Sequence, residues 1–171
     1  MTCKTIIRPV TQDDLEQISD LHANAFGPGR FARTAYRVRE GAHVVSPFCL
    51  AASRGGVVVG AVRMTEIEIG GKGGALLLGP LVVDPSLKGE GIGRALLGEC
   101  IEQARYDGYQ LILLVGDLAY YERVGFVRVL PGQVALAGPV DPLRLLAAEL
   151  QPGSLSAVHG DVMARPRQPT D

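Results

Sequence analysis

The segment LKGEGIGRALL, residues 87–97, places three glycines where a helix is about to begin. The residues after them are good helix formers, whereas a glycine inside a helix costs about 1 kcal/mol relative to alanine. Three roles for these glycines are open. They could form a tight turn that binds nothing, bind a dinucleotide, or leave main-chain N–H groups accessible to an anion.

The two common nucleotide-binding motifs do not fit this segment. The pattern Gly-x-Gly-x-x-Gly requires a third glycine at Arg94 when counted from Gly89, and at Leu96 when counted from Gly91. The segment also follows several strands and does not lie in an opening strand–helix–strand unit. A Walker A loop needs Gly-Lys-Ser/Thr, which is missing here. A nucleotide-binding oxidoreductase is therefore disfavoured.

An anion site explains the glycines better than a bare turn, for which one glycine is enough. The N-terminus of a helix has unpaired N–H groups and about half a positive charge. Glycines keep side chains away from those N–H groups, so phosphate oxygens can reach them. Lys88 and Arg94 add positive charge at either end of the loop. We therefore interpret the segment as a pyrophosphate-binding loop.

Composition excludes several classes of protein. The 171 residues are 47% hydrophobic and 20% charged, which suits a single folded domain, expected at 1–165 with a loose tail at 166–171. A net charge of −1 without a basic block argues against a nucleic-acid partner, and the apolar runs are too short to cross a membrane. The cysteines and histidines are scattered and lack metal-ligand spacing, and no signal-peptide pattern is present. We expect a cytoplasmic protein without a metal site.

Hydrophobic periodicity predicts the order of the elements. Strands are predicted at residues 4–10, 48–54, 57–69, 75–84, 109–116, 126–130 and near 156–164. Helices are predicted at residues 12–25, 30–41, 94–107, 117–125 and 141–150. Consecutive strands imply antiparallel hairpins, whereas the strand–helix–strand unit 75–115 implies a parallel crossover. The predicted fold class is α/β (α+β), with a mixed, mostly antiparallel sheet flanked by helices and a bulge or break at Gly79-Pro80.

Two motifs resemble the GNAT N-acetyltransferases. The segment VVDPSLKGEGIGRALL is similar to the family's acetyl-coenzyme A motif, Val-x-Pro followed by Arg/Gln-x-x-Gly-x-Gly/Ala at a helix start. The matching positions are Val83, Pro85, Lys88, Gly91 and Gly93, with lysine in place of arginine or glutamine. The segment AYYERVGF, residues 119–126, resembles the family's Tyr-x-x-x-Gly-Phe ending. The similarity covers about residues 5–130, and the C-terminal segment resembles an uncharacterised bacterial branch of the family.

The resemblance implies a fold and a co-substrate. In this family two parallel strands splay apart, here 75–84 and 109–115, and acetyl-coenzyme A (acetyl-CoA) binds between them. The pantetheine arm would follow the main chain of Leu81, Val82 and Val83. The pyrophosphate would contact amides of the loop formed by Lys88, Gly89, Glu90, Gly91, Ile92, Gly93 and Arg94. Asp117 stands where the family often has an asparagine that contacts pantetheine, although helix capping would also explain it.

The reaction implied by the resemblance is direct attack of a primary amine on the thioester. The amine must be neutral to attack, because an alkylammonium has no free electron pair. The oxyanion needs a donor, such as the amide of Val82 or Val83, and the departing thiolate needs a proton. Tyr121 occupies the family's general-acid position, with Tyr120 as the alternative. Either could instead be an ordinary core tyrosine.

The sequence leaves the general base and the acceptor open. Glu66 or Glu68 could receive the amine proton, although their alternation with isoleucines is more typical of a solvated strand face. His43, in a loop near the expected acceptor side, is another possible base, but a lone loop histidine usually has no catalytic role. Deprotonation of the amine through water is therefore the default expectation. Four arginines in 30–39 could hold an acidic group of the acceptor or form a solvated helix face.

Two functions remain after these exclusions. The first is an N-acetyltransferase acting on a small-molecule or peptide amine, and homodimers are common among such small domains. The second is a non-catalytic acyl-CoA sensor or interaction domain on the same fold. Strand 75–84 carries no carboxylate before Asp84, which gives the second some weight.

Overall fold

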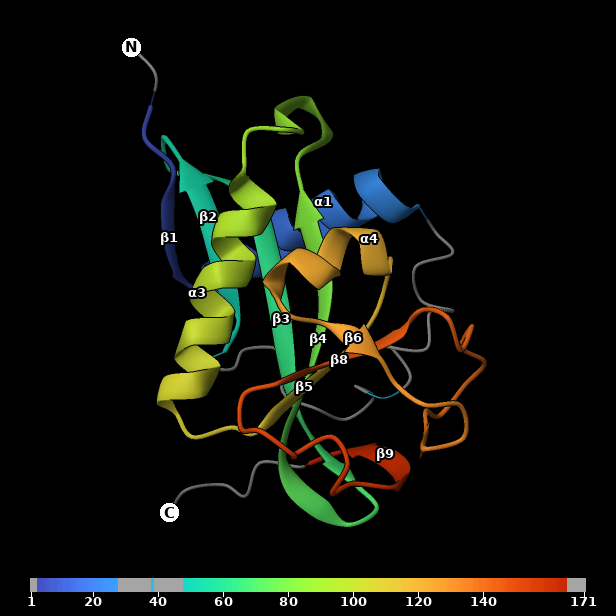
Figure 1. Ribbon diagram of the computed structural model, residues 1–171. Coiled ribbons are helices and arrows are strands. Elements are labelled where there is room, and N and C mark those ends of the chain that lie inside the picture. Colours follow the sequence, from blue (N-terminus) through green and yellow to red (C-terminus); the bar gives the residue numbers. More distant parts are fainter. Residues whose placement is uncertain (1–2, 28–37, 39–47, 166–171) are drawn as a thin grey trace.

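The structure is a computed structural model that describes residues 3–27, 38 and 48–165. Figure 1 shows a central sheet with helices on both of its faces. The strands are β1 (Ile6–Pro9), β2 (Leu50–Arg54), β3 (Val57–Ile69), β4 (Lys72–Val83), β5 (Leu111–Val115), β6 (Val127–Arg128), β7 (Val134–Ala135), β8 (Leu145–Glu149) and β9 (Gly160–Ala164). The α-helices are α1 (Leu15–Phe26), α3 (Ile92–Tyr106) and α4 (Leu118–Tyr121), with 3-10 turns at Gln12–Asp14, Pro85–Leu87 and Glu122–Val124.

The sheet is mixed and mostly antiparallel, as predicted. Its main order is β1-β2-β3-β4-β5-β8-β6, and β9 adds to the far end of β3. Within the described part of the chain, the parallel pairs are β4 with β5 and β7 with β9. The β4–β5 pair is the expected crossover, because α3 connects these two strands.

The parallel pair opens along its length. Residues 75–77 of β4 pair with residues 111–113 of β5, and the structure pairs the two strands no further within the described residues. Beyond residue 77, β4 keeps its pairing with β3 on one side only. The edge of β4 that faces β5 is therefore available to another extended group.

A bulge marks the point where the two strands separate. Gly79 and Pro80 together lie opposite the single residue Arg63 of β3. Two residues against one is the definition of a β-bulge, which bends the strand that carries it. The expected bulge at Gly79-Pro80 is confirmed.

The core is divided between the two faces of the sheet. Helices α3 and α4 lie over one face and α1 over the other (Figure 1). Leu96, Leu97 and Cys100 of α3 are buried against alternate strand residues such as Met64 and Leu76. This buried face fixes α3, and hence the glycine loop before it, relative to β4.

The prediction of a helix at 141–150 is wrong, because residues 145–149 form strand β8 in the interior of the sheet. Each residue of β8 lies opposite a residue of β5, and β6 pairs on its other side. Leu145 and Ala147 are buried on one face, and Leu146 and Ala148 on the other. A helix on the molecular surface would bury only one stripe of side chains. Packing on both faces therefore outweighs the helix propensity of LLAAE.

Within the described residues the strand predicted at 57–69 is found at its predicted bounds, and the other predicted elements are found with shifted ends. The helix expected at 12–25 begins as a 3-10 turn, and the strand expected near 156–164 is confined to β9. The helix predicted at 30–41 lies outside the described residues except for Val38, as do His43 and the tail. Among the described helices, none combines the length and hydropathy needed to span a bilayer.

Candidate functional site

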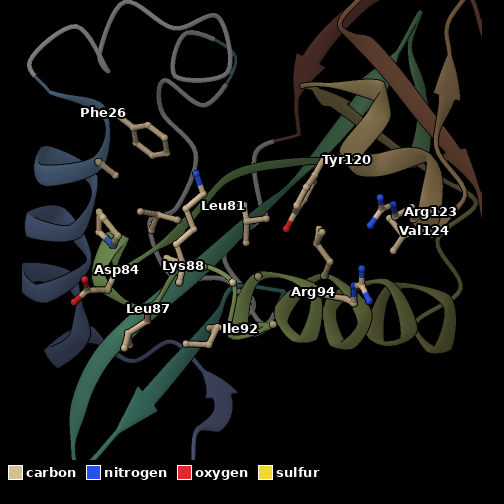
Figure 2. Close-up of a pocket in the computed structure, with 18 residues that line it drawn as sticks. Phe26, Leu81, Asp84, Leu87, Lys88, Ile92, Arg94, Tyr120, Arg123 and Val124 are labelled. Carbon is tan, nitrogen blue, oxygen red and sulfur yellow. The ribbon is translucent and has the colours of Figure 1, made fainter.

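A groove of about 800 Å³ opens where β4 ends and α3 begins. Figure 2 shows its walls, which come from five parts of the chain. These are the end of α1, the last residues of β4, the glycine loop, the first turn of α3, and α4 with its 3-10 extension. The groove thus runs along the end of β4, in the part that is no longer paired with β5, to the start of α3.

The glycine loop presents unpaired main-chain N–H groups to this groove. The first helical hydrogen bond of α3 is donated by the Ala95 N–H to the Gly91 carbonyl, at 3.0 Å. The amides of residues 92–94 precede that bond and are the free donors of a helix start. Ile92, Gly93 and Arg94 all line the groove. These donors and the helix dipole suit a phosphate group.

Each of the three glycines also has its own structural reason. Gly89 has φ +88° and Gly91 has φ +81°, a left-handed conformation that side-chain-bearing residues rarely adopt. Gly93 has an ordinary φ, but a Cβ there would lie 2.9 Å from the hydroxyl of Tyr120. Backbone conformation therefore explains the glycines at positions 89 and 91, and the nearby Tyr120 hydroxyl explains the glycine at position 93. These structural reasons are compatible with access of an anion to the free amides.

The free edge of β4 presents the main chain of alternate residues to the groove. The Asp84 N–H donates to the Val59 carbonyl of β3 at 2.8 Å, and Val82 lies opposite Ala61. Main-chain groups alternate between the two edges of an antiparallel strand. Those of Leu81 and Val83 therefore point away from β3, toward the gap. Val82 also lines the groove, but its amide is directed at β3.

The groove is positively charged. Among the described residues that line it, Lys88, Arg94 and Arg123 are cations and Asp84 is the one carboxylate. Lys88 approaches from one side of Tyr120, and Arg94 and Arg123 from the other (Figure 2). Hydrogen bonds from the hydroxyl and the amide of Ser86 hold the pKa of Asp84 below its usual value. Asp84 is thus occupied in forming the turn.

The two adjacent tyrosines lie in different surroundings. Tyr120 is 49% exposed and lines the groove. Tyr121 packs edge-on against Phe126, with ring centroids 5.7 Å apart, and its ring lies 2.6 Å from where Gly116 would carry a Cβ. Burial, with smaller contributions from Tyr120 and Asp117, raises the pKa of Tyr121 to about 12. Tyr121 therefore lies against the end of β5 as a neutral hydroxyl.

Neither candidate base lies in the groove. Glu66 accepts a hydrogen bond from the hydroxyl of Tyr109, and Glu68 is 3.7 Å from Arg165. Their side chains alternate with Ile67 and Ile69, which are buried on the opposite face from α3. Glu66 lies opposite Leu76, where β4 is still paired with β5, and Glu68 lies further toward the same end of β3. The structure therefore does not bring either glutamate to the part of β4 beyond residue 77.

Two further residues assigned from sequence also point elsewhere. Glu90 belongs to the glycine loop but does not line the groove, and its carboxylate pairs with Arg54 at 2.8 Å. Asp117 precedes α4 without capping it through its side chain, and it lies 3.6 Å from Arg144. Its main-chain carbonyl accepts from the amides of both tyrosines, which fixes the start of α4.

Some lining residues were not found from the sequence. Arg123 follows Tyr121 by two positions, and a basic residue in a short helix gives no signal by itself. Phe26, the last residue of α1, reaches the groove only because α1 packs beside the end of β4. Such a contact is set by tertiary structure and leaves no mark in the local sequence.

Comparison with known proteins identifies the family. Residues 15–126, more than half of the chain, match the family model described as "Acetyltransferase (GNAT) family". The chain belongs to the GNAT family. This membership agrees with the mixed sheet and the splayed strands.

Two Escherichia coli relatives are similar in sequence. YjhQ of strain K12, an uncharacterized N-acetyltransferase, is 30% identical over 67% of this chain and 65% of its own length. YhbS of the same strain, also uncharacterized, is 32% identical over 42% of this chain and 43% of its own length. The aligned part thus spans less than two thirds of each relative.

Two solved GNAT structures share the fold. The crystal structure of YhbS in complex with CoA has a TM-score of 0.81 at 24% identity, over 96% of this chain and 92% of that chain. A GNAT acetyltransferase of Brucella melitensis in complex with acetyl-CoA has a TM-score of 0.60 at 29% identity, over 84% and 95%. The first comparison, below 25% identity, shows the fold alone.

Proposed function

We propose that this chain is an N-acetyltransferase that moves an acetyl group from acetyl-CoA to a primary amine by direct attack. One observation carries the proposal. The same groove joins a helix start with free amides to a free strand edge, and three cations surround it. A polyanionic pyrophosphate suits the first part, and an extended amide-containing arm suits the second.

The residues present fit such a co-substrate. The amides of residues 92–94 would bind the pyrophosphate, and Lys88, Arg94 and Arg123 would neutralise its charge. The main chain of Leu81 and Val83 would pair with the pantetheine arm. The CoA and acetyl-CoA complexes of two structural relatives support this assignment. When bound, acetyl-CoA supplies the activated acetyl group as a thioester.

Tyr121 is our candidate for the general acid. Its hydroxyl is protonated at neutral pH, and burial, which raises its pKa to about 12, extends that range toward higher pH. A neutral hydroxyl can donate to a thiolate as that thiolate departs. Tyr120, whose hydroxyl lies in the groove beside Gly93, is the competing donor. A main-chain amide of β4 that faces the gap would stabilise the oxyanion. Of the two expected amides, those of Val82 and Val83, the amide of Val83 faces the gap.

The amine is deprotonated through water in this proposal. Glu66 is occupied by Tyr109, and Glu68 lies near Arg165, both away from the groove. A water-mediated route needs no carboxylate at the splayed strands, and the acceptor can also reach the site in its neutral form.

Among the described residues, Asp84 is the only carboxylate that lines the groove, and it accepts hydrogen bonds from Ser86. This also favours the second candidate, an acyl-CoA sensor that binds without turnover. Incubation with acetyl-CoA and a panel of amines, followed by measurement of free thiol release and of acetylated product, distinguishes the two. The panel should include amino acids, polyamines, aminoglycosides and lysine peptides. Acetylation of any member supports the transferase. Saturable binding without acetylation across the whole panel would favour the sensor.

A further inference from the structure

Glu90 puts a negative charge into a loop that is built to bind an anion. It lies between Gly89 and Gly91, the two glycines with left-handed backbone conformation. Its N–H donates to the Leu87 carbonyl at 3.3 Å, which fixes the backbone of the loop at this point. Because the free amides begin two residues later, an unrestrained carboxylate here would compete with a phosphate for them.

Arg54 holds this carboxylate from outside the groove. Arg54 is the last residue of β2, and its Nη2 lies 2.8 Å from Oε2 of Glu90. The guanidinium is itself fixed by Thr5, whose hydroxyl accepts from Nε at 3.0 Å and from Nη2 at 2.8 Å. The side chain of Arg54 is 26% exposed and that of Glu90 is 46% exposed. An arginine held at two points loses less freedom on pairing than a lone surface arginine.

Charge balance gives this contact a consequence for binding. Lys88, Arg94 and Arg123 face the groove, whereas Glu90 and Arg54 do not line it. While Glu90 is paired, its charge is compensated and directed away from the amides. Without Arg54 the carboxylate would be free to turn toward them, and a negative charge within about 8 Å of a phosphate repels it appreciably at low salt.

We propose that Arg54 is a positioning residue for the pyrophosphate loop, which it serves by holding the Glu90 carboxylate away from the anion site. The inference rests on the proposed function, because the anion is the pyrophosphate of acyl-CoA. Arg54 touches no co-substrate in this scheme. Its effect is on affinity and not on the chemical step.

The test is a double-mutant cycle that measures the affinity for acetyl-CoA. Isothermal titration calorimetry gives the dissociation constant for the parent, Arg54→Gln, Glu90→Gln and the double variant. We expect Arg54→Gln to weaken binding about three- to tenfold at low salt, with much of the loss removed at about 0.5 M salt. Glu90→Gln should stay within about twofold of the parent, and the double variant should regain the parent's affinity within about twofold.

The controls separate positioning from other effects. Arg105→Gln removes a similar charge from an exposed pair with Glu102 at the far end of α3 and should leave affinity unchanged. Thr5→Val removes the second anchor of the guanidinium and should give a smaller loss in the same direction as Arg54→Gln. It also keeps the test informative if Arg54→Gln does not fold, which a thermal melt would show.

Three outcomes would overturn the inference. If the double variant stays as weak as Arg54→Gln, Arg54 acts directly on the co-substrate. If Glu90→Gln tightens binding as much as Arg54→Gln weakens it, the effect is additive long-range charge. If Arg54→Gln binds like the parent, the contact has no role in affinity. In all three cases the parent still binds acetyl-CoA, so the proposed function stands. A parent that does not bind overturns both.

Discussion

At the scale of single residues, the two tyrosines of AYYERVGF show what a motif can and cannot specify. The side chains of neighbouring helix residues point about 100° apart, so two adjacent tyrosines cannot both point into the same cavity from the same direction. The motif places both tyrosines near the splayed strands but does not say which surface each faces. The structure puts Tyr120 in the groove and Tyr121 against the end of β5.

Replacing Tyr121 by phenylalanine tests the general acid. We expect kcat to fall about a hundredfold, the low end for one proton-transfer group, with little change in acetyl-CoA affinity. Tyr120→Phe is the matched control, because it removes the same hydroxyl one residue away. Steady-state kinetics and calorimetry on both variants decide between them. A Tyr121→Phe enzyme as fast as the parent, with Tyr120→Phe impaired, would transfer the role to Tyr120.

The ionisation of Tyr121 gives a second prediction at this scale. Burial disfavours the tyrosinate, so the hydroxyl should ionise near a pKa of about 12 and not near 10. Below pH 10 the buried neutral form adds to stability, and that contribution is lost as pH rises through about 12. An ultraviolet difference titration between the parent and Tyr121→Phe measures it. Ionisation of this residue near 10 would show that it is solvated.

At the scale of elements, a buried carboxylate ties β1 to α1. Asp14 is 4% exposed and accepts two hydrogen bonds from Arg8, at 2.7 and 2.8 Å, and one from the Thr11 amide at 2.8 Å. Its pKa lies well below the usual range, chiefly because of the Arg8 guanidinium. The N-terminal strand and the first helix are therefore joined by charge as well as by packing.

Asp14→Asn should lower the free energy of unfolding by about 2 kcal/mol at neutral pH. Because the pKa of Asp14 is lower in the folded state, its ionised carboxylate stabilises the fold at pH values above its unfolded-state pKa of about 3.9. That contribution is lost as the pH falls below this value. The difference between parent and variant should therefore shrink in acid. Denaturant unfolding at several pH values measures it, with exposed Asp13→Asn as control. A difference that does not vary with pH would contradict this account.

The contact between β3 and α3 gives another prediction. A Cβ at Gly60 would lie 3.2 Å from side-chain atoms of both Ile92 and Leu96. Gly60→Val should therefore push on the start of α3 and cost about 2 kcal/mol of stability. Gly98→Ala, on the exposed side of the same helix with nothing within 4 Å of its Cβ, should stabilise by about 1 kcal/mol. Chemical unfolding of both variants measures these changes. If Gly60→Val leaves the free energy of unfolding unchanged, the start of α3 can move away from β3 without a cost in stability.

The sequence predicts an element well where its signal is local. Strand β3 was predicted at its observed bounds, because glycine turns flank an uninterrupted run of strand formers. The helix predicted at 141–150 failed for the opposite reason. Its local signals, an aspartate, a proline and a run of leucines and alanines, favour a helix, but the edge of β5 requires a strand there. Pairing with a distant strand cannot be detected in a ten-residue window.

At the scale of the whole molecule, the strand order places the site. The parallel pair β4–β5 opens beyond residue 77, and the glycine loop follows β4 after one 3-10 turn, Pro85–Leu87. Both features were predicted, the first through the family resemblance and the second from the glycines. The contribution of Phe26 and the distance of Glu66 and Glu68 from the groove could not be predicted, because they depend on how separate elements pack.

The most direct test of the account is a calorimetric titration of the purified protein with acetyl-CoA, with NAD as the control ligand. We predict a dissociation constant on the order of micromolar for acetyl-CoA and no binding of NAD. Binding should raise the melting temperature of the parent and be lost when Gly91 and Gly93 are both replaced by valine. Absence of acetyl-CoA binding to the folded parent would mean that the glycines serve only the turn, and the proposed transferase activity would fall with the site.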